Sequence, residues 1–434
     1  MSRSARFDRG HTDDLMTFLA ASPTPYHAVA NAAERLEKAG FRQVRETDAW
    51  EGTTGGKYVL RGGALIAWYV PEGAEPHTPF RIVGAHTDSP NLRVKPLPDT
   101  GAYGWRQVAV EVYGGPLLNT WLDRDLGLAG RLSLRDGTHR LVHVDRPLLR
   151  VPQLAVHLDR GVNTDGLKLN PQRHMQPIWG LGEAEEGDLI RFVAEEAGVD
   201  ASDVTGWDLM PHSVEPPAYL GRDRELVAGP RMDNLLSVHA GTAALAAVAG
   251  AADSGSALPY IPVLAAFDHE ESGSQSDTGA DGPLLGTVME RSVLARGGSY
   301  EDRARALAGT VCLSSDTGHA VHPNYAERHD PTHHPRVNGG PILKVNVNMR
   351  YSTDGGGRAV FAAACERAGV PWQSFVSNNS MPCGTTIGPI TAARHGIKTV
   401  DIGAAIVSMH SARELCGADD PFLLANALTA FLES

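Results

Sequence analysis

The chain has 434 residues, of which 42% are hydrophobic and 21% charged. This composition lies near the globular average and excludes a disordered chain, while the length indicates two or three domains. With 39 Lys and Arg against 51 Asp and Glu, the formal charge is -12 and no dense basic stretch occurs, so we expect neither a nucleic-acid nor an anionic-membrane partner.

The cysteines and the apolar segments suggest where the protein works. Four cysteines stand far apart without CxxC spacing: Cys312, Cys365, Cys383 and Cys416. They predict neither a disulfide framework nor a zinc knuckle. Charged residues precede any apolar run at the N-terminus, and the apolar stretch 235–252 is interrupted by Ser237, His239 and Thr242. We therefore predict no signal peptide, a buried helix rather than a membrane span, and a cytoplasmic protein.

In chain order, the first ninety residues predict two helices followed by strands. Residues 12–19 and 26–39 have helical apolar spacing, and 57–73 (KYVLRGGALIAWYVPEG) predicts a hairpin. The apolar segment 80–88 (FRIVGAHTD) predicts a strand that runs into polar residues. From 91 to 225 the pattern changes to short β-rich runs, RQVAVEVYGG, LAGRLSLRD, HRLVHVD and VPQLAVHL, separated by Gly, Asp and Pro.

After Pro230 helices and strands alternate again. We predict a helix over 233–250, strands over 260–268, 309–316, 342–351 and 398–403, and a final helix. Such alternation is typical of an α/β sheet covered by helices. We expect a discontinuous α/β domain, 1–90 with 226–434, that carries an inserted β-rich domain, 91–225.

Acids and histidines recur directly after the predicted strands of the α/β part. They are His86 and Asp88, Asp268 with Glu270 and Glu271, Asp316, and His410. In open α/β sheets ligands bind beyond the carboxyl ends of the strands, so these groups can converge. Paired acids need a compensating cation, and Zn, Mn and Co accept imidazole and carboxylate together. The pattern therefore predicts a metal site.

Each of these residues taken alone also has an ordinary structural explanation. His86 could be a core histidine and Asp88 a turn residue, Asp233 an N-cap, the Glu270–Glu271 pair a solvated face, Asp316 an Asx turn, and His410 a capping or packing residue. For Asp233 considered alone, the N-cap is the favoured interpretation, because it opens an apolar helix.

Several longer motifs resemble the aspartyl aminopeptidase family of metallopeptidases, in its bacterial type. They are GAHTDSP (84–90), YGGPLLNTWLDRDL (113–126), RMDN (231–234), FDHEESGS (267–274), SSDTGHAVHPNY (314–325), NSMPCGTTIGPI (379–390) and SMHS (408–411). The resemblance runs from PTPYHAV at 23–29 to the C-terminal region. Ordered motifs over nearly the whole chain are highly specific.

The resemblance implies two zinc ions per subunit in a zinc-peptidase-like mixed sheet flanked by helices, with Mn or Co as substitutes. It assigns His86 and Asp316 to one metal, Glu271 and His410 to the other, and Asp233 as the bridging carboxylate. Glu270 is implied as the general base and acid, acting on a metal-activated water. Asp88 would orient the imidazole of His86.

The resemblance also implies that the β-rich insertion is a dimerisation and lid domain. Within VHLDR, His157 is implied to reach into a neighbouring subunit's site and stabilise the oxyanion. Considered alone, His157 would be a strand-face histidine. The family's tetrahedral dodecamer, built from dimers, is the implied assembly.

For an acidic substrate side chain, the family pattern points to His319, Lys344 and Tyr351. Lys344 considered alone could instead be a strand-end lysine that reaches to water. The sequence departs from the pattern at Met232, where Leu is usual, and at Thr317 and Gly318, where larger residues often occur. Gly318 beside His319 could loosen the pocket.

We therefore expect a dinuclear zinc aminopeptidase that removes N-terminal Asp or Glu from peptides. A broader aminopeptidase or an amidohydrolase of N-acyl amino acids remains an alternative, as does a noncatalytic assembly or cargo scaffold. The complete set of five ligands and the intact Glu270 speak against the scaffold, which needs no proton shuttle.

Overall fold

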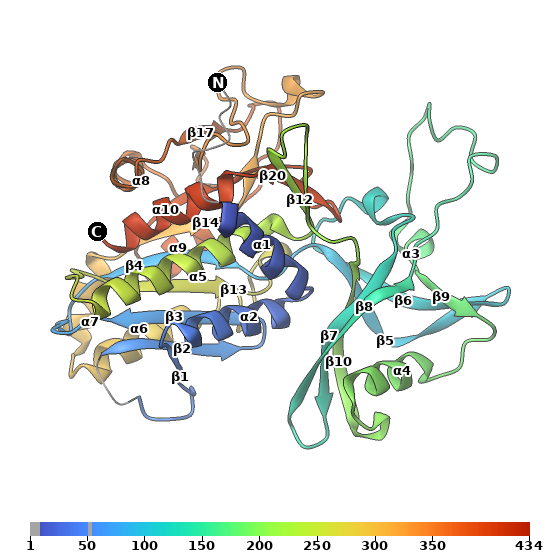
Figure 1. Cartoon of the computed structure of the whole chain (residues 1–434), viewed down its shortest axis with the longest axis horizontal. Helices are drawn as coiled ribbons and strands as arrows, with labels where there is room; N and C mark the ends of the chain where they lie inside the picture. Colours follow the sequence, from blue (N-terminus) through green and yellow to red (C-terminus); the bar gives the residue numbers. More distant parts are fainter. Residues whose placement is uncertain (1–8, 51–53) are drawn as a thin grey trace.

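A nine-stranded mixed sheet forms the centre of the computed structural model, which describes residues 9–50 and 54–434 (Figure 1). Its strands, in the order in which they lie side by side, are β1 (Arg42–Gln43), β2 (Gly55–Arg61), β3 (Ala64–Val70), β13 (Ile261–Phe267), β4 (Phe80–His86), β14 (Val311–Ser315), β18 (Lys398–Gly403), β16 (Ile342–Val345) and β17 (Gln373–Val376). The central strands β13, β4, β14 and β18 are parallel. The predicted α/β class is confirmed.

Helices cover both faces of this sheet, and each face has its own hydrophobic core. One core contains residues of α1 (Arg9–Ala21), α2 (Pro25–Lys38), α5 (Met232–Asp253), α8 (Gly355–Ala368) and α10 (Asp420–Leu432). The other contains residues of α6 (Leu284–Ala295), α7 (Tyr300–Ala308) and α9 (Ile387–His395). Because both faces are covered, β3, β4 and β13 are buried along their whole length.

The helix α5 is long and apolar enough to cross a membrane by composition alone. In the structure it packs against α10, α2, β4 and β13, and most of it is buried. The prediction of a buried helix here is confirmed.

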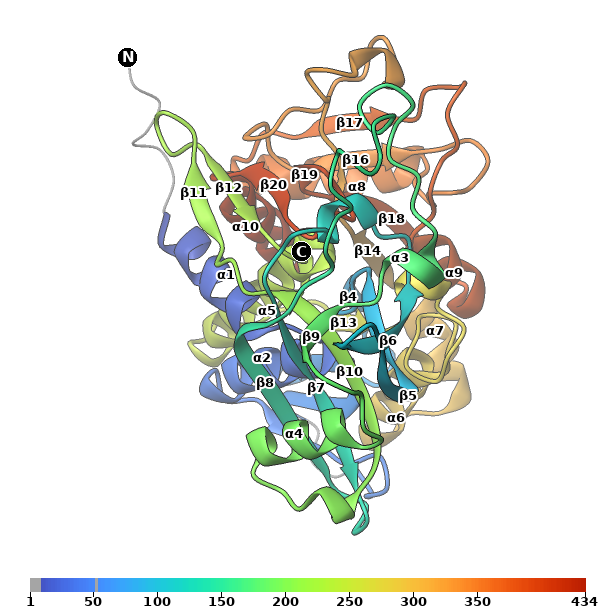
Figure 2. The same ribbon diagram turned by 90° about the vertical axis from the view of Figure 1, so that its right-hand side faces the viewer.

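Most of segment 91–225 forms two small antiparallel sheets, which lie beside the large sheet in Figure 1 and in front of it in Figure 2. One contains β5 (Asn91–Ala102), β6 (Trp105–Tyr113) and β9 (Ile178–Leu181), and the other contains β10 (Val204–Ser213), β7 (Leu126–Leu134) and β8 (His139–Leu149). They share a third core with α4 (Asp188–Ala197), a helix that the sequence analysis did not predict; the short helix α3 (Pro171–His174) lies between β8 and β9.

A five-stranded sheet brings strands from residues 218–229 together with strands from residues 318–319 and 405–417. Its order is β11 (Ala218–Leu220), β12 (Leu226–Gly229), β20 (Glu414–Gly417), β19 (Ala405–Val407) and β15 (Gly318–His319). β11 lies inside the predicted insertion and β12 lies after it, yet the two strands pair. The strand pairing therefore does not mark a domain boundary at residue 225. The domain division at 91 and 225 therefore stays a prediction.

Two predicted strands are wrong in whole or in part. VPQLAVHL forms one bridge residue and then a loop, in which Leu154, Val156 and Leu158 are 58%, 49% and 75% exposed. Its alternating pattern resembles a strand, but the loop carries no strand ladder. The strand predicted over 342–351 ends at Val345, because Asn346 accepts a hydrogen bond from the Asn348 backbone and turns the chain. The N-terminal residues 1–8, in which no signal peptide was predicted, lie outside the described residues.

Candidate active site

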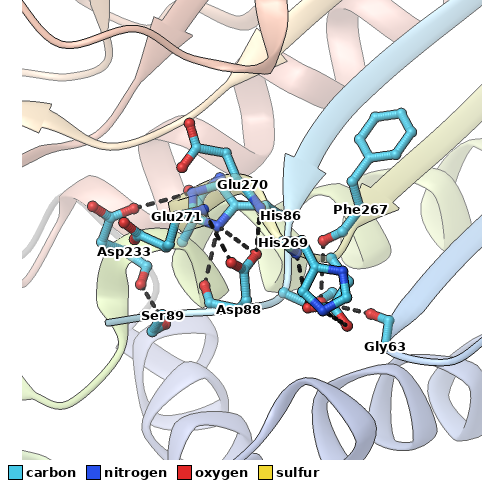
Figure 3. Close-up of polar contacts among 12 residues, drawn as sticks. Gly63, His86, Asp88, Ser89, Asp233, Phe267, His269, Glu270 and Glu271 are labelled. Carbon is cyan, nitrogen blue, oxygen red and sulfur yellow. Dashed lines mark hydrogen bonds and ion pairs between the residues drawn. The ribbon is translucent and has the colours of Figure 1, made fainter. Parts of the chain in front are cut away.

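Three neighbouring parallel strands end at one edge of the large sheet, and each is followed by acids or histidines. His86 ends β4 and is paired with Phe267, the last residue of β13, while Gly84 on the other side pairs with Ser314 of β14. The residues that follow these strands, including Glu270, Glu271 and Asp316, therefore share one edge. Figure 3 shows His86, Asp88, Glu270 and Glu271 gathered there with Asp233.

Asp233 reaches this edge from the start of α5. Its backbone angles depart from helical values and its side chain makes no capping bond, so the N-cap interpretation is wrong. The carboxylate instead faces His86 and His410, and the backbone of Asp233 is held in place by the side chains of Ser89 and Glu414. The Ser89 hydroxyl donates to the Asp233 carbonyl at 2.6 Å.

The distances define two groups of potential ligands that share Asp233. In the first, His86 Nε2 lies 3.3 Å from Asp233 Oδ1 and 3.5 Å from Asp316 Oδ1. In the second, His410 Nε2 lies 3.5 Å from Asp233 Oδ2 and 3.4 Å from Glu271 Oε2. Ligands at about 2.0 to 2.1 Å from a tetrahedral zinc are separated by roughly 3.3 Å. Both groups therefore have the spacing that one ion would require.

The hydrogen bonds of the two histidines leave Nε2 as the ligating nitrogen. His86 Nδ1 lies 3.0 Å from the Asp88 carbonyl oxygen, and His410 Nδ1 lies 2.9 Å from the Gly115 carbonyl oxygen. A carbonyl only accepts, so each Nδ1 carries the proton and donates it. Each Nε2 can then direct its lone pair into the group of carboxylates.

The buried acids at this edge of the sheet also favour the binding of cations. Asp233 Oδ1 and Glu271 Oε1 are buried and have no hydrogen-bond partner. Burial raises the pKa of Glu271 well above its ordinary value, and the charge of Asp233 raises it further. Burial alone would lower the pKa of His86, but Asp233, Asp316 and Asp88 raise it well above its ordinary value. Orphaned buried oxygens and crowded acids are what a pair of cations would neutralise.

Glu270 lies beside both groups without being part of either. It forms a short 3-10 turn, η3 (Glu270–Ser272), and its backbone amide donates to Asp88 Oδ1 at 3.1 Å. Burial and the neighbouring acids raise the pKa of Glu270 to about 8, although the charge of His86 acts in the opposite direction. A carboxyl group with such a pKa can exchange a proton near neutral pH.

Asp88 is fully buried and holds the loop that carries both glutamates. Its carboxylate accepts from the amides of Glu270 and Glu271, each at 3.1 Å, and from the Tyr113 hydroxyl at 2.6 Å. The Asp88 carboxylate is 3.4 Å from His86 Nδ1, whereas its backbone carbonyl is 3.0 Å away. Asp88 thus holds the imidazole mainly through its backbone and the glutamate loop through its side chain.

Sequence reasoning missed Glu414, a buried residue of β20. One of its carboxylate oxygens accepts from the Asp233 amide at 3.0 Å and the other from the His410 amide at 2.8 Å. Burial and the charge of Asp233 raise the pKa of Glu414 to about 8. It joins the backbones of two candidate ligands 177 positions apart, and its place four residues after His410 was the only sequence signal.

Two of the residues expected to bind an acidic side chain, His319 and Tyr351, line a cavity of about 270 Å³ together with Arg328, and Lys344 lies outside this lining. Lys344 is 2% exposed, so the view of it as a solvated strand-end lysine is wrong. Its Nζ donates to the Thr317 carbonyl at 2.7 Å and lies 3.5 Å from Asp316 Oδ2. Lys344 therefore sits between the candidate metal ligands and the ring of Tyr351, whose centroid is 5.5 Å away.

His157 is not brought into either group of candidate ligands. It is exposed in a turn of the loop that projects near α3 (Figure 1), so the view of it as a strand-face histidine is wrong. Its neighbours Leu154, Val156 and Leu158 are exposed as well.

Comparison with known proteins agrees with this geometry. The family model described as aminopeptidase I zinc metalloprotease (M18) matches residues 18–432. The chain belongs to the M18 family. This M18 metallo-aminopeptidase is 83% identical, over the full length of both chains, to a "Probable M18 family aminopeptidase 2" of Streptomyces coelicolor. The family resemblance seen in the sequence is confirmed.

Two solved structures of similar fold bear on the assembly of the protein. A chain of an Ape4 and Nbr1 complex is 35% identical, with a TM-score of 0.93, and the match covers 98% of this chain and 86% of that one. A chain of the S. cerevisiae mApe1 dodecamer is 28% identical, with a TM-score of 0.85 over 98% and 96% of the two chains.

Proposed function

We propose that this M18 aminopeptidase is a dinuclear zinc enzyme that removes N-terminal Asp or Glu from peptides. The observation that carries the proposal is the shared carboxylate of Asp233, which faces His86 in one group of ligands and His410 in the other. Asp316 completes the first group and Glu271 the second. Two metal ions held by these residues would neutralise the crowded acids and would give partners to Asp233 Oδ1 and Glu271 Oε1, which make no hydrogen bond.

When bound, two zinc ions lower the pKa of a water molecule and polarise the scissile carbonyl, and Mn or Co can substitute. Glu270 is the proposed general base, which takes the proton of the water and returns it to the leaving amine. Its carboxyl group is free for this task because its loop is held by backbone bonds to Asp88 rather than by its own side chain.

The proposed preference for acidic residues rests on Arg328 and His319, which line the cavity beside Tyr351, and on Lys344, whose Nζ lies 5.5 Å from the centre of the Tyr351 ring. Lys344 supplies a buried ammonium group, and His319 and Arg328 supply further donors. A carboxylate that enters a closed pocket needs such partners, because an unpaired buried charge costs several kcal/mol.

The proposed assembly is a tetrahedral dodecamer built from dimers, in which His157 reaches a neighbouring subunit and stabilises the oxyanion. The exposed apolar side chains on both sides of His157 support a contact surface there. The solved structure of S. cerevisiae mApe1, which has a similar fold, is that of a dodecamer. The inserted segment 91–225 would serve as the dimerisation and lid domain.

We further propose a cytoplasmic location, which the four free cysteines support. Three of them are buried within the core, where they act as small apolar residues.

The function is tested by comparing aspartyl, glutamyl, leucyl and N-acetylated substrates with chelated and zinc-reloaded protein. We expect cleavage of the two acidic substrates, loss of activity on chelation and recovery with Zn, Mn or Co. Faster cleavage of the leucyl or acetylated substrate contradicts the specificity, and indifference to chelation contradicts the metal mechanism.

A second test uses Glu270→Gln, with Glu301→Gln, an exposed glutamate on α7, as the matched control. We expect Glu270→Gln to lose turnover while it keeps its metal content, and the control to keep both. Loss of metal from Glu270→Gln would show that Glu270 is a ligand rather than the base.

A further inference from the structure

A second cluster of potential metal ligands lies in the β10-β7-β8 sheet, away from the candidate active site. It consists of His143 and Asp145 on β8 and His212 on β10, whose ligand atoms all lie within 4.8 Å of one another. His143 and Asp145 are two positions apart on β8, and His143 Nε2 lies 3.9 Å from Asp145 Oδ1. His212 comes from a strand that is separated from β8 by β7.

Gly127 in the intervening strand β7 leaves room for the His212 side chain to reach toward β8. Gly127 of β7 is paired with His212. A Cβ atom at Gly127 would lie 2.6 Å from His212 Nε2 and 2.2 Å from the Val144 carbonyl oxygen, so no other residue fits without displacing them. The imidazole of His212 occupies the space above Gly127, and its centroid lies 4.9 Å from that of His143.

The His212 side chain has an unused nitrogen directed into this cluster. His212 is 3% exposed, and its Nε2 is buried without a hydrogen-bond partner. Nδ1 lies 3.3 Å from the Ser213 carbonyl oxygen, which only accepts, so Nδ1 carries the proton. Nε2 is therefore the ring nitrogen that is available to bind a metal ion.

The electrostatic surroundings keep both histidines neutral. Burial, together with the nearby guanidinium of Arg231, lowers the pKa of His212 to about 3. Burial lowers the pKa of His143 as well, despite the opposing charge of Asp145. Arg231 itself donates to the carbonyls of Leu19 and Ser22. The cluster thus offers two neutral imidazoles and one carboxylate.

We propose that His143, Asp145 and His212 bind an additional divalent transition-metal ion, of the zinc, cobalt or nickel type. Two imidazoles and a carboxylate are a donor set that these ions accept. His143 Nε2 and Asp145 Oδ1 are 3.9 Å apart, against the roughly 3.3 Å between ligands of a tetrahedral zinc. The side chains of His143 and Asp145 are 26% and 62% exposed, so they have room to close around an ion held by the buried His212.

Such an ion would join the two outer strands of the sheet across the central one. It would lie beside α2, whose His27 ring is 5.7 Å from that of His143. The site is therefore expected to stabilise the sheet and its contact with the helix, and it needs none of the residues proposed for catalysis.

The test compares the zinc content per chain of the full-length wild type, Asp145→Asn and His143→Gln after equilibration with zinc and dialysis. The control is His139→Gln, an exposed histidine on the same strand β8. We expect wild type and control to hold one equivalent more than the other two variants. Because only the difference between variants matters, the result does not depend on how much metal the active site binds.

Thermal unfolding with and without added zinc provides a second measurement. We expect a smaller zinc-induced rise of the melting temperature in Asp145→Asn than in His139→Gln, because a ligand that binds only the folded state stabilises it. Asp145 is largely exposed, so its substitution should leave folding intact. Equal zinc content and equal thermal shifts in all four proteins would overturn the proposal.

Discussion

Replacing Asp88 with Asn tests whether one buried carboxylate fixes the position of the proposed general base. The Asp88 side chain accepts from two backbone amides, at Glu270 and Glu271, and from the Tyr113 hydroxyl. An asparagine keeps one accepting oxygen and presents an NH₂ group in place of the other. At least one buried amide then faces a donor instead of an acceptor.

The expected magnitude follows from these bonds. Leaving one buried donor unsatisfied costs about 1 to 3 kcal/mol, and replacing a group that orients a metal ligand typically costs about 10-fold to 100-fold in activity or metal affinity. Tyr113→Phe removes only the hydroxyl bond and leaves both amide bonds in place. We therefore expect Asp88→Asn to lose at least about tenfold in kcat/KM, and Tyr113→Phe to lose less.

The assay is kcat/KM on an aspartyl substrate, measured with the metal content and the melting temperature of wild type and both variants. The account predicts that Asp88→Asn has the larger defect and that it appears in kcat, because Glu270 is displaced. An Asp88→Asn enzyme with wild-type kcat would refute the reasoning. So would a larger loss in Tyr113→Phe.

Three other predictions concern residues whose titratable side chains are buried. Glu414→Gln should reduce metal affinity about 10-fold or more, measured by competition with a chelator, because its NH₂ group would face a backbone amide of one candidate ligand; unchanged affinity contradicts this role. Lys344→Met should lower kcat/KM for an aspartyl substrate at least about tenfold relative to a leucyl one, since a charge-assisted bond contributes about 1.5 to 3 kcal/mol; an unchanged ratio argues against acidic recognition. Burial lowers the pKa of His27 to about 4, so the unfolded chain binds more protons between about pH 6.5 and pH 4, and stability falls as the pH falls through that range. In chelated protein the contribution of His27 to the loss from pH 7 to pH 5 should be about 2 kcal/mol, and His27→Gln should reduce the loss by about that amount in urea titrations; an equal pH dependence contradicts the assignment.

The sequence was sufficient to predict the convergence of acids and histidines. His86, Asp316 and the Glu270–Glu271 pair each follow an apolar strand, and the parallel pairing of β13, β4 and β14 brings them to one edge. The prediction held because a strand buried on both faces leaves its polar residues only at its end.

Other features depend on contacts that a local pattern does not contain. In the sequence Asp233 opens an apolar helix as an N-cap would, yet the side chains of Ser89 and Glu414 hold its backbone while its carboxylate faces the histidines. Glu414 itself lies on a short strand whose pairing with β12 and β19 is set by residues far along the chain. The alternating residues of VPQLAVHL lack a partner strand, so their pattern does not produce a ladder.

The proposed dinuclear centre is tested most directly by crystallography of zinc-loaded protein, with anomalous data collected on both sides of the zinc absorption edge. The account predicts two peaks roughly 3.5 to 4 Å apart, with Asp233 between them. One peak should contact His86 and Asp316, and the other Glu271 and His410. A single peak, or zinc bound away from Asp233 in active protein, would contradict it.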